Sequence, residues 1–319
     1  MKPCLFSVSY AGFWGQAALP LPDFIARAGR FGYPAVMLMG KRPHFSLLDM
    51  KGEELEAVRS ALGSANTRCE IIGAYTNLAP VSASEVPFIE MQIAYVEAVA
   101  RLGAELGAKI VRLFTAYESD QHDIQASWNR VVTAVREICD RVAPLGMTVA
   151  IQNHHDIGLH TDALIDLLGE ISRPNCKLGF DAWSPALRGE NIHEAARKAA
   201  PHTAITTNAD YIKVPRWRYR PEFVNYEQQS PDWVRAVQFG TGFIDYKAFF
   251  TGLREGGFDG LAVYEMCSPL AGGGSIENLD AKARAYLDWM RAQKFIAGFP
   301  PWPPSRFARS SCEEPSQSR

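Results

Sequence analysis

Short runs of apolar residues recur along the chain, separated by segments in which the apolar residues follow a helical spacing. Runs such as 109–114, 147–151 and 176–180 are largely apolar throughout and do not alternate strictly with polar residues. Strands that are buried on both faces have this pattern, and such strands belong to parallel sheets covered by helices. The runs predicted as strands begin near residues 4, 34, 69, 109, 147, 176, 203 and 260.

The intervening segments predict amphipathic helices. The strongest apolar stripes span residues 89–100 and 128–142, where apolar side chains recur every three or four positions. Weaker stripes lie at 24–31, 164–171 and 286–290. Strand and helix therefore alternate along most of the chain.

Eight strand and helix units occupy residues 1–298, at about 37 residues a unit. The simplest closure of that pattern is an α/β fold of the (β/α)8 type, a TIM barrel, with a doubly wound open sheet as the alternative. No G-x-G-x-x-G follows the first run and no Walker loop is present, which disfavours a nucleotide-binding open sheet. A length of 319 residues alone favours two domains, but eight units of about 37 residues account for residues 1–298 as a single domain.

The predicted organisation is one barrel domain at 1–298 and a disordered tail at 299–319. The tail is rich in proline and serine and has no apolar periodicity. The chain contains 33 Lys and Arg against 35 Asp and Glu, a formal net charge of −2, so nothing favours nucleic acid or an anionic membrane as a partner. The expected partner is a small molecule, and a homo-oligomer is compatible with the sequence.

Other sequence features indicate a cytoplasmic protein. No apolar stretch approaches the 18 residues of a membrane span, and the first residues lack the apolar segment of a signal peptide. The six cysteines are far apart and include no C-x-x-C pair, so neither a disulfide framework nor a structural zinc site is predicted.

Polar residues end the last four predicted strands, which is where a barrel carries its functional groups. Helix capping could explain any one of these residues. Glu265 is harder to explain in that way, because it lies within an apolar run and a buried carboxylate needs a cation or several donors to stay charged. Asp181 is lodged among apolar residues in the same manner. The four polar strand ends are residues 152–156, 181–184, 206–210 and 265.

The ordered set of motifs resembles the xylose-isomerase-like TIM barrels, the sugar phosphate isomerase/epimerase superfamily. GTGFID at 240–245, GGFDG at 256–260 and the strand that ends in Glu265 look like the last third of that family. VAIQNH at 149–154 is similar to its fifth-strand motif, and LGFD at 178–181 to its sixth. The resemblance covers about residues 4–293.

The resemblance implies one divalent metal that polarises a sugar carbonyl or hydroxyl while a flanking carboxylate moves a proton. Carried over by position, the ligands are Gln152, Asp181, Asn208 and Glu265. Gln152 stands where the family has Glu, Asn208 stands near the usual His with Thr207 as the alternative, and Ser184 replaces another usual His. Because the implied ligands are all oxygen donors, the expected metal is Mn²⁺ or Mg²⁺.

The substitution at position 152 also changes the expected acid and base chemistry. Gln152 cannot accept a proton, so an epimerisation that uses two carboxylates lacks one partner. Imidazole titrates near neutral pH, so His154 or His155 is predicted to supply the second acid or base beside Glu265.

The expected substrate contacts come from loops. The segment 211–238 is longer than an ordinary barrel loop and is cationic and aromatic, so we predict a lid or binding loop that uses Lys213 and Arg216. Trp14 is predicted to form an aromatic wall, and Ser184 to contact the substrate from the sixth strand.

Two enzymatic functions follow. The first is a metal-dependent sugar isomerase or epimerase that abstracts a proton next to a carbonyl. The alternative is a lyase, dehydratase or deglycosidase that acts on an oxidised sugar by β-elimination at the same metal site, and the loss of the fifth-strand carboxylate favours it. Seven dispersed histidines and the net charge argue against an endonuclease with a multi-zinc cluster. A sugar-binding barrel without catalysis is permitted by Gln152 but disfavoured by Asp181 and Glu265.

Overall fold

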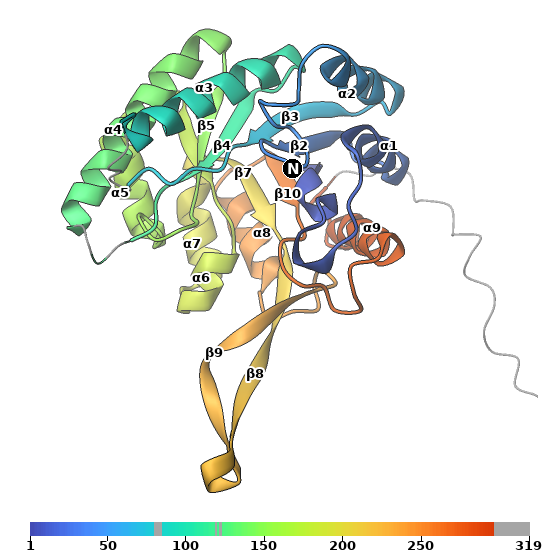
Figure 1. Ribbon diagram of the computed structural model, residues 1–319, viewed down its shortest axis with the longest axis vertical. Helices are drawn as coiled ribbons and strands as arrows, with labels where there is room; N and C mark the ends of the chain where they lie inside the picture. The colour runs from blue at the N-terminus through green and yellow to red at the C-terminus, as the bar shows by residue number, and fades with distance from the viewer. Residues whose placement is uncertain (80–84, 119, 121–122, 297–319) are drawn as a thin grey trace, which may run out of the picture.

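Eight parallel strands close into a barrel in the computed structural model, which describes residues 1–79, 85–118, 120 and 123–296 (Figure 1). Neighbouring strands follow chain order, and β10 pairs with β1 to complete the closure. This confirms the predicted TIM barrel and excludes the open sheet. Each predicted run starts within two residues of a barrel strand. The barrel strands are β1 (Lys2–Phe6), β2 (Ala35–Met39), β3 (Arg68–Gly73), β4 (Ile110–Phe114), β5 (Thr148–Gln152), β6 (Cys176–Gly179), β7 (Thr203–Asn208) and β10 (Leu261–Tyr264).

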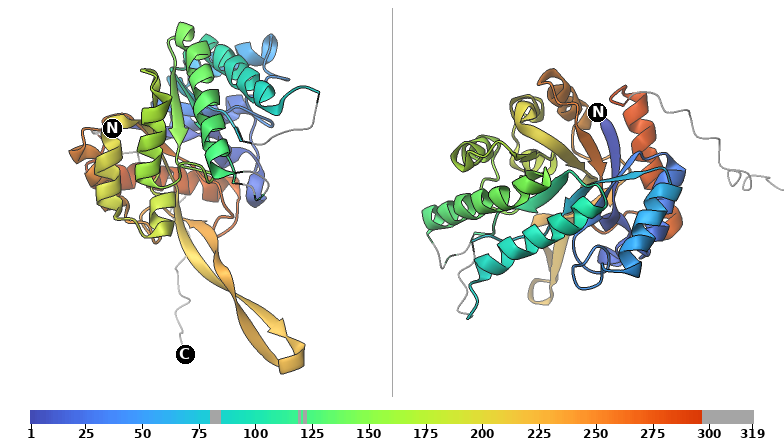
Figure 2. Two further views of the ribbon diagram at one scale, coloured as in Figure 1. Left: turned by 90° about the vertical axis from the view of Figure 1, so that its left-hand side faces the viewer. Right: turned by 90° about the horizontal axis from the view of Figure 1, so that it is seen from above.

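Helices surround the barrel, as the view from above shows (Figure 2). The two strongest predicted stripes lie inside α3 and α4, and no helix in the described ranges is long and apolar enough to cross a membrane. The helices are α1 (Leu21–Phe31), α2 (Glu53–Ser64), α3 (Phe88–Glu105), α4 (Ile124–Val142), α5 (Thr161–Ile171), α6 (Trp183–Arg188), α7 (Ile192–Ala199), α8 (Tyr246–Glu255) and α9 (Ile276–Ala292). Single 3-10 turns occur at η1 (Ser7–Tyr10), η2 (Phe13–Gly15), η3 (Ala143–Leu145), η4 (Ala200–His202) and η5 (Pro221–Phe223).

The core has two parts, because successive side chains of a strand point to opposite faces. One part fills the barrel interior, and the other packs between the barrel and the helices. On β7, for example, Ile205 lies in the interior cluster. On β5, Ala150 lies inside while Val149 and Ile151 pack against the helices. This alternation determines which residue at each strand end faces the barrel mouth.

The segment predicted as a lid or binding loop forms an antiparallel ribbon of two strands, β8 (Asp210–Arg220) and β9 (Asn225–Val237). The ribbon leaves the barrel and projects away from it (Figures 1 and 2). Its distal part is exposed on both strands. Only the base of the ribbon lies against the barrel, so its distal part does not cover the barrel as a lid (Figure 1), whereas Tyr211 and Trp233 at the base line a cavity of the barrel, as a binding segment would. The predicted tail, 299–319, and the domain end at 298 lie outside the described residues.

Candidate active site

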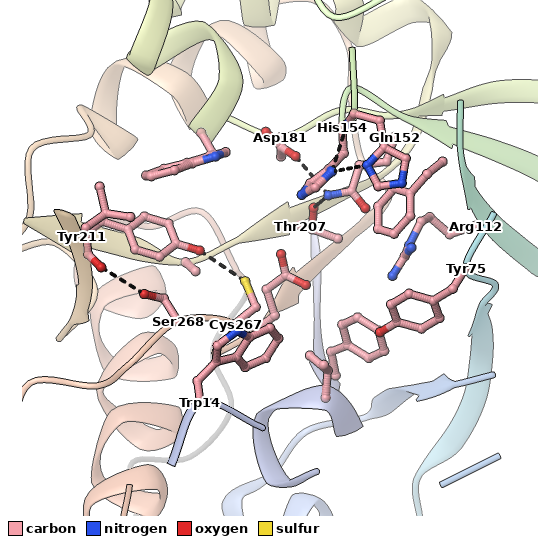
Figure 3. A pocket seen from close by; sticks show the side chains of 18 of the residues that line it. Trp14, Tyr75, Arg112, Gln152, His154, Asp181, Thr207, Tyr211, Cys267 and Ser268 are labelled. Carbon is pink, nitrogen blue, oxygen red and sulfur yellow. Dashed lines mark hydrogen bonds between the residues drawn. The ribbon is translucent and has the colours of Figure 1, made fainter. Parts of the chain in front are cut away.

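A cavity of about 760 Å³ opens at the carboxyl ends of the barrel strands (Figure 3). A volume of this size is typical of small-molecule sites. The cavity combines a polar floor with aromatic walls that come from widely separated segments of the chain. The floor contains Arg112, Gln152, Asp181, Thr207 and Glu265, and the walls contain Trp14, Tyr75, Phe114, Trp183, Tyr211 and Trp233.

Strand alternation brings the floor residues into the cavity. Ile205 on β7 and Val263 on β10 pack inside the barrel. Residues two positions further along a strand point to the same side, so Thr207 and Glu265 face the mouth. Both residues line the cavity.

Gln152 lies at the centre of the polar floor. Its Nε2 donates hydrogen bonds of 2.9 Å to Asp181 Oδ2 and of 2.9 Å to Thr207 Oγ1. Its Oε1 is buried and has no hydrogen-bond partner among the described residues. Because buried polar atoms are usually hydrogen-bonded, this amide oxygen has room for a cation or for a donor from a ligand.

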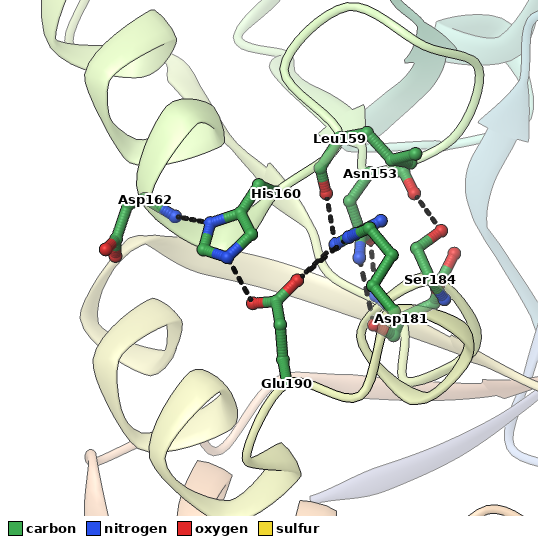
Figure 4. Close-up of polar contacts among 8 residues, drawn as sticks. Asn153, Leu159, His160, Asp162, Asp181, Ser184 and Glu190 are labelled. Carbon is green, nitrogen blue, oxygen red and sulfur yellow. Dashed lines mark hydrogen bonds and ion pairs between the residues drawn. The ribbon is translucent and has the colours of Figure 1, made fainter.

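Asp181 is held by hydrogen bonds to its backbone and its carboxylate (Figure 4). Asn153 accepts a bond from the Asp181 amide at 2.7 Å and donates one to the Asp181 carbonyl at 3.0 Å. The Ser184 amide donates to Asp181 Oδ1 at 3.3 Å, and the Ser184 hydroxyl donates to the Asn153 carbonyl at 2.7 Å. Burial raises the pKa of Asp181 to about 6.

These bonds define a positioning role for Ser184 and Asn153. Ser184, which was predicted to contact the substrate, is buried outside the cavity lining. Sequence reasoning missed Asn153, although its place directly after a buried strand was visible.

Glu265 faces the cavity from the end of β10. Burial raises the pKa of its carboxyl group to about 7, and the positive charge of Arg112 opposes part of that rise. The two side chains form no ion pair within 4.0 Å. Glu265 thus combines access to a ligand with a pKa near neutral pH, which suits a general acid or base.

Asn208, the first choice for the ligand on this strand, does not line the cavity. Its Nδ2 donates to the Val263 carbonyl at 2.9 Å, and its Oδ1 accepts from the Thr206 hydroxyl at 2.9 Å. It is fully buried on the outer side of β7. Thr207, the alternative left open by the sequence, is the residue of this strand that lines the cavity.

His154 and His155 both line the cavity, as expected from their place after β5. Their Nδ1 atoms lie 2.9 Å apart, and the ring of His155 stacks on Tyr117 with 3.8 Å between the centroids. Burial, together with neighbouring positive charge, lowers the pKa of each imidazole to about 4. Both rings are therefore neutral at pH 7, which suits hydrogen bonding to a carbonyl better than proton donation.

Lys213 and Arg216, which were predicted to bind the substrate, lie outside the cavity lining. Lys213 Nζ lies 4.6 Å from the centroid of the Phe243 ring, and Arg216 Nε donates to the Pro231 carbonyl on the ribbon at 2.8 Å. The predicted wall residue Trp14 does line the cavity.

Two cations that the sequence analysis did not single out line the cavity instead, Lys41 and Arg112. The sequence alone could have identified Arg112 as a candidate site residue, because it is a charged residue within an apolar strand. The same signal identified Glu265.

The floor fits a divalent cation in the type of its donors. The described residues contain no group of three or more His, Cys, Asp or Glu side chains that could hold a metal. The oxygen donors of the floor are the carboxylates of Asp181 and Glu265, the unpartnered amide oxygen of Gln152 and the hydroxyl of Thr207. Such an all-oxygen set matches Mn²⁺ or Mg²⁺ better than a metal that prefers nitrogen and sulfur.

Comparison with known proteins agrees with this architecture. The family described as xylose isomerase-like TIM barrel matches residues 25–293. Inosose dehydratase from Lacticaseibacillus casei is 27% identical over 202 residues, which are 58% of this chain and 62% of that protein. The match thus spans less than two thirds of the relative's length.

Two solved structures show the same fold at low sequence identity. The IOLI protein with a bound zinc atom has a TM-score of 0.70 and 16% identity, with 92% of this chain and 99% of that chain covered. D-allulose 3-epimerase from Methylomonas sp., in complex with D-allulose, has a TM-score of 0.68 and 16% identity, covering 92% of this chain and 97% of that chain.

Proposed function

The chain belongs to the xylose isomerase-like TIM barrel family, and from this premise we propose that it is an enzyme that removes a proton next to a carbonyl group of a sugar or cyclic polyol. The observation that carries the proposal is the convergence of Asp181, Glu265 and the unpartnered amide oxygen of Gln152 on one cavity. A cavity that only bound sugar would have little use for two buried carboxylates, because their burial costs free energy.

Asp181, Glu265, Gln152 and Thr207 would together hold one divalent ion, Mn²⁺ or Mg²⁺. When bound, such an ion polarises the substrate carbonyl and so acidifies the neighbouring C–H bond. The two carboxylates supply the charge that balances the ion, while the neutral amide and hydroxyl complete the oxygen set. Gln152 also orients Asp181 and Thr207 through its two hydrogen bonds.

Glu265 is the base in this proposal, because its carboxylate faces the cavity and forms no ion pair with Arg112 that would have to be broken first. His154 and His155 remain neutral at pH 7 because the pKa of each is about 4. Their role is to hold substrate oxygens by hydrogen bonds rather than to deliver a proton.

The proposed site has one base, Glu265, and no second acid. That combination favours β-elimination over epimerisation. An epimerase must return a proton to the opposite face of the same carbon, and Gln152 and the two neutral imidazoles provide no acid for that step at neutral pH. In an elimination, Glu265 takes the proton from the carbon next to the carbonyl, and the C–O bond at the β-carbon breaks. The same proton then passes to the leaving oxygen, so one residue serves both steps. The products are an unsaturated ketone and water or an alcohol.

The known relatives support both reactions, since one matched protein is an inosose dehydratase and another a D-allulose 3-epimerase. We propose dehydratase or related lyase activity as the main reaction, with isomerisation as the competing outcome. The enzyme loaded with Mn²⁺ should be incubated with an inosose and with a ketohexose in D₂O, and the products analysed by NMR and ultraviolet absorbance.

The proposal predicts an enone that absorbs in the ultraviolet and forms from the inosose. An intact sugar inverted at one carbon, without any dehydrated product, would show epimerisation instead. If neither substrate exchanges or reacts with Mn²⁺, Mg²⁺ or Zn²⁺ present, the proposed chemistry is wrong.

A further inference from the structure

Two positively charged side chains line the cavity, and neither forms an ion pair. Arg112 extends from β4, and Lys41 follows the end of β2. No acidic oxygen lies within 4.0 Å of either side-chain cation in the described part of the chain. Figure 3 places Arg112 and Tyr75 on one side of the cavity, away from Asp181 and Tyr211.

Arg112 is a buried guanidinium with unused hydrogen-bonding capacity. The residue is 1% exposed, its Nη1 donates to the Ala74 carbonyl at 3.1 Å, and its Nε has no partner among the described residues. Its Cζ lies 4.2 Å from the centroid of Phe114 and 5.1 Å from that of Tyr75. The rings restrict the orientation of the guanidinium, and a guanidinium fixed in this way suits a planar, two-oxygen anion.

Lys41 continues this positive surface toward the rim of the cavity. Its Nζ lies 3.9 Å from the centroid of Tyr75, whose ring thus contacts both cations, and 5.4 Å from that of Phe13. Burial and the nearby charge of Arg112 lower the pKa of the Lys41 ammonium group. Two like charges that share one aromatic ring repel each other, and a bound anion would relieve that repulsion.

The balance of charged residues in the cavity lining indicates that a negative group is missing. Its lining contains two basic residues, Lys41 and Arg112, and two acidic ones, Asp181 and Glu265. If the two carboxylates hold a divalent cation, as the proposed function requires, no acidic residue of the lining remains for the two basic ones. The counter-ion must then come from the ligand.

We propose that Arg112 and Lys41 form a subsite for an anionic group of the substrate, so that the substrate is an acidic sugar or acidic cyclic polyol. This inference rests on the proposed function. A carboxylate and a phosphate ester share the required chemistry, namely two or more charged oxygens that a guanidinium and an ammonium can bind together.

Binding to the Mn²⁺-loaded full chain, measured by isothermal titration calorimetry, tests the subsite. D-glucuronate and D-glucose form a matched pair, because they differ only in a carboxylate against a CH₂OH group. Glucose 6-phosphate tests the phosphate, and inorganic phosphate tests a free anion. We expect at least one acidic sugar to bind ten or more times more tightly than glucose, with the preference falling as salt is raised.

Lys41→Met should reduce that preference to threefold or less. Lys109→Met removes the same charge at an exposed residue just before β4, outside the cavity lining, and should leave the preference unchanged. Arg112→Lys keeps the charge but loses the fork of donors, and it should weaken carboxylate binding more than phosphate binding. Because Arg112 is buried, thermal unfolding must first show that this variant is folded.

Equal binding of acidic and neutral sugars overturns the subsite. So does tight binding of inorganic phosphate without any preference for an acidic sugar, which would indicate an adventitious anion only. Solvent exchange separates this failure from failure of the proposed function. Exchange of deuterium into a neutral keto sugar, without preference for an acidic one, leaves the chemistry standing and the subsite wrong. A preference in binding with no exchange in any keto sugar leaves the subsite standing and the chemistry wrong.

Discussion

The floor of the cavity and the β8–β9 ribbon both follow barrel strands, and both are rich in polar and aromatic residues. In the floor, Gln152 donates hydrogen bonds to Asp181 and to Thr207, and all three side chains are buried. The ribbon is solvated, with Trp217 58% exposed and Phe223 72% exposed. Half of the fourteen exposed large hydrophobic side chains in the described residues belong to this ribbon.

The difference shows which polar residues are informative in a sequence. A charge within a buried strand has a cost that some partner must offset, so its presence points to a site. A charged residue in an exposed segment has no such cost, and a long cationic segment is therefore compatible with many roles. Lys213 and Arg216 illustrate the second case, and Glu265 the first.

The largest expected effect is on Glu265. Glu265→Gln removes the proposed base while preserving the shape of the side chain, so kcat/KM for β-elimination should fall by about a thousandfold or more. Steady-state rates on an inosose measure this, with thermal unfolding as the control for folding. A loss of kcat/KM of less than tenfold would show that another residue is the base. It would also weaken the contrast in functional importance between the floor and the ribbon.

Gln152→Glu tests whether the floor is built for a cation. In the metal-free protein the new carboxylate replaces the donor to Asp181 Oδ2, so the free energy of unfolding should fall by about 1–3 kcal/mol. With Mn²⁺ bound, the third carboxylate should instead increase metal affinity by about tenfold or more. Thermal unfolding with and without Mn²⁺ measures both effects. A variant that is equally destabilised in both conditions contradicts the metal site.

The contribution of Asp181 to the stability of the metal-free protein, measured against Asp181→Asn, should fall as the pH rises through the acidic range. Burial raises the pKa of Asp181 from 3.8 to about 6, so the folded state holds a proton that the unfolded state has already released. Raising the pH from about 4 to about 6 therefore favours unfolding, by on the order of 1–3 kcal/mol. Urea unfolding in EDTA measures this effect, and Asp181→Asn should flatten the dependence. Stability that rises over this range, relative to Asp181→Asn, would contradict the account.

Neighbouring residues on β7 should separate metal binding from stability. Thr207→Val removes a hydroxyl that lines the cavity and accepts from Gln152 Nε2, so it should weaken Mn²⁺ binding severalfold and also lower the free energy of unfolding of the metal-free protein by about 1–3 kcal/mol. Asn208→Ala leaves the Val263 carbonyl without its donor and should lower the free energy of unfolding by about 1–3 kcal/mol, with Mn²⁺ affinity unchanged. Calorimetry and urea unfolding measure the two quantities. A loss of Mn²⁺ affinity in Asn208→Ala but not in Thr207→Val would favour Asn208 as the ligand.

The smallest effect is expected on the ribbon. Trp217→Ser changes an exposed side chain far along β8, so kcat/KM for an inosose should stay within about twofold of the wild-type value. The same steady-state assay measures it. A loss comparable to that of Glu265→Gln would show that the ribbon takes part in catalysis after all.

Most of the fold could be predicted from the sequence, because buried parallel strands are nearly continuous apolar runs. All eight starts were placed within two residues, and the closed barrel followed from their number. Helices α2, α6 and α7 were not predicted. α6 and α7 span only six and eight residues, too few to show a clear stripe, and α2 buries only Leu55, Val58 and Leu62 among its 12 residues.

The site could be predicted only in part. Gln152, Asp181 and Glu265 were identified because each ends an apolar strand. Thr207 and Asn208 could not be separated, because β7 reads TAITTN and its polar residues face both sides of the barrel. The resemblance left Thr207 and Asn208 as alternatives for one ligand position, and a shift of one residue reverses the face to which a side chain points.

The sequence patterns indicate neither the ribbon nor Lys41, whereas Arg112 could have been found as a charge within an apolar strand. The ribbon has mixed polar and aromatic residues without a buried face, so nothing in the hydropathy pattern distinguished two strands from a loop. Lys41 lies just beyond the end of β2, and no apolar context marks it as unusual.

The central claim is that Glu265, on a floor that holds a divalent ion, removes a proton next to a substrate carbonyl. The most direct measurement is solvent deuterium exchange into an inosose, followed by NMR with the wild-type enzyme and Glu265→Gln, each with Mn²⁺ and with EDTA. The account predicts deuterium at the carbon next to the carbonyl, or its loss through dehydration, only for the wild-type enzyme with Mn²⁺. Exchange that is as fast in Glu265→Gln, or as fast in EDTA, would contradict it.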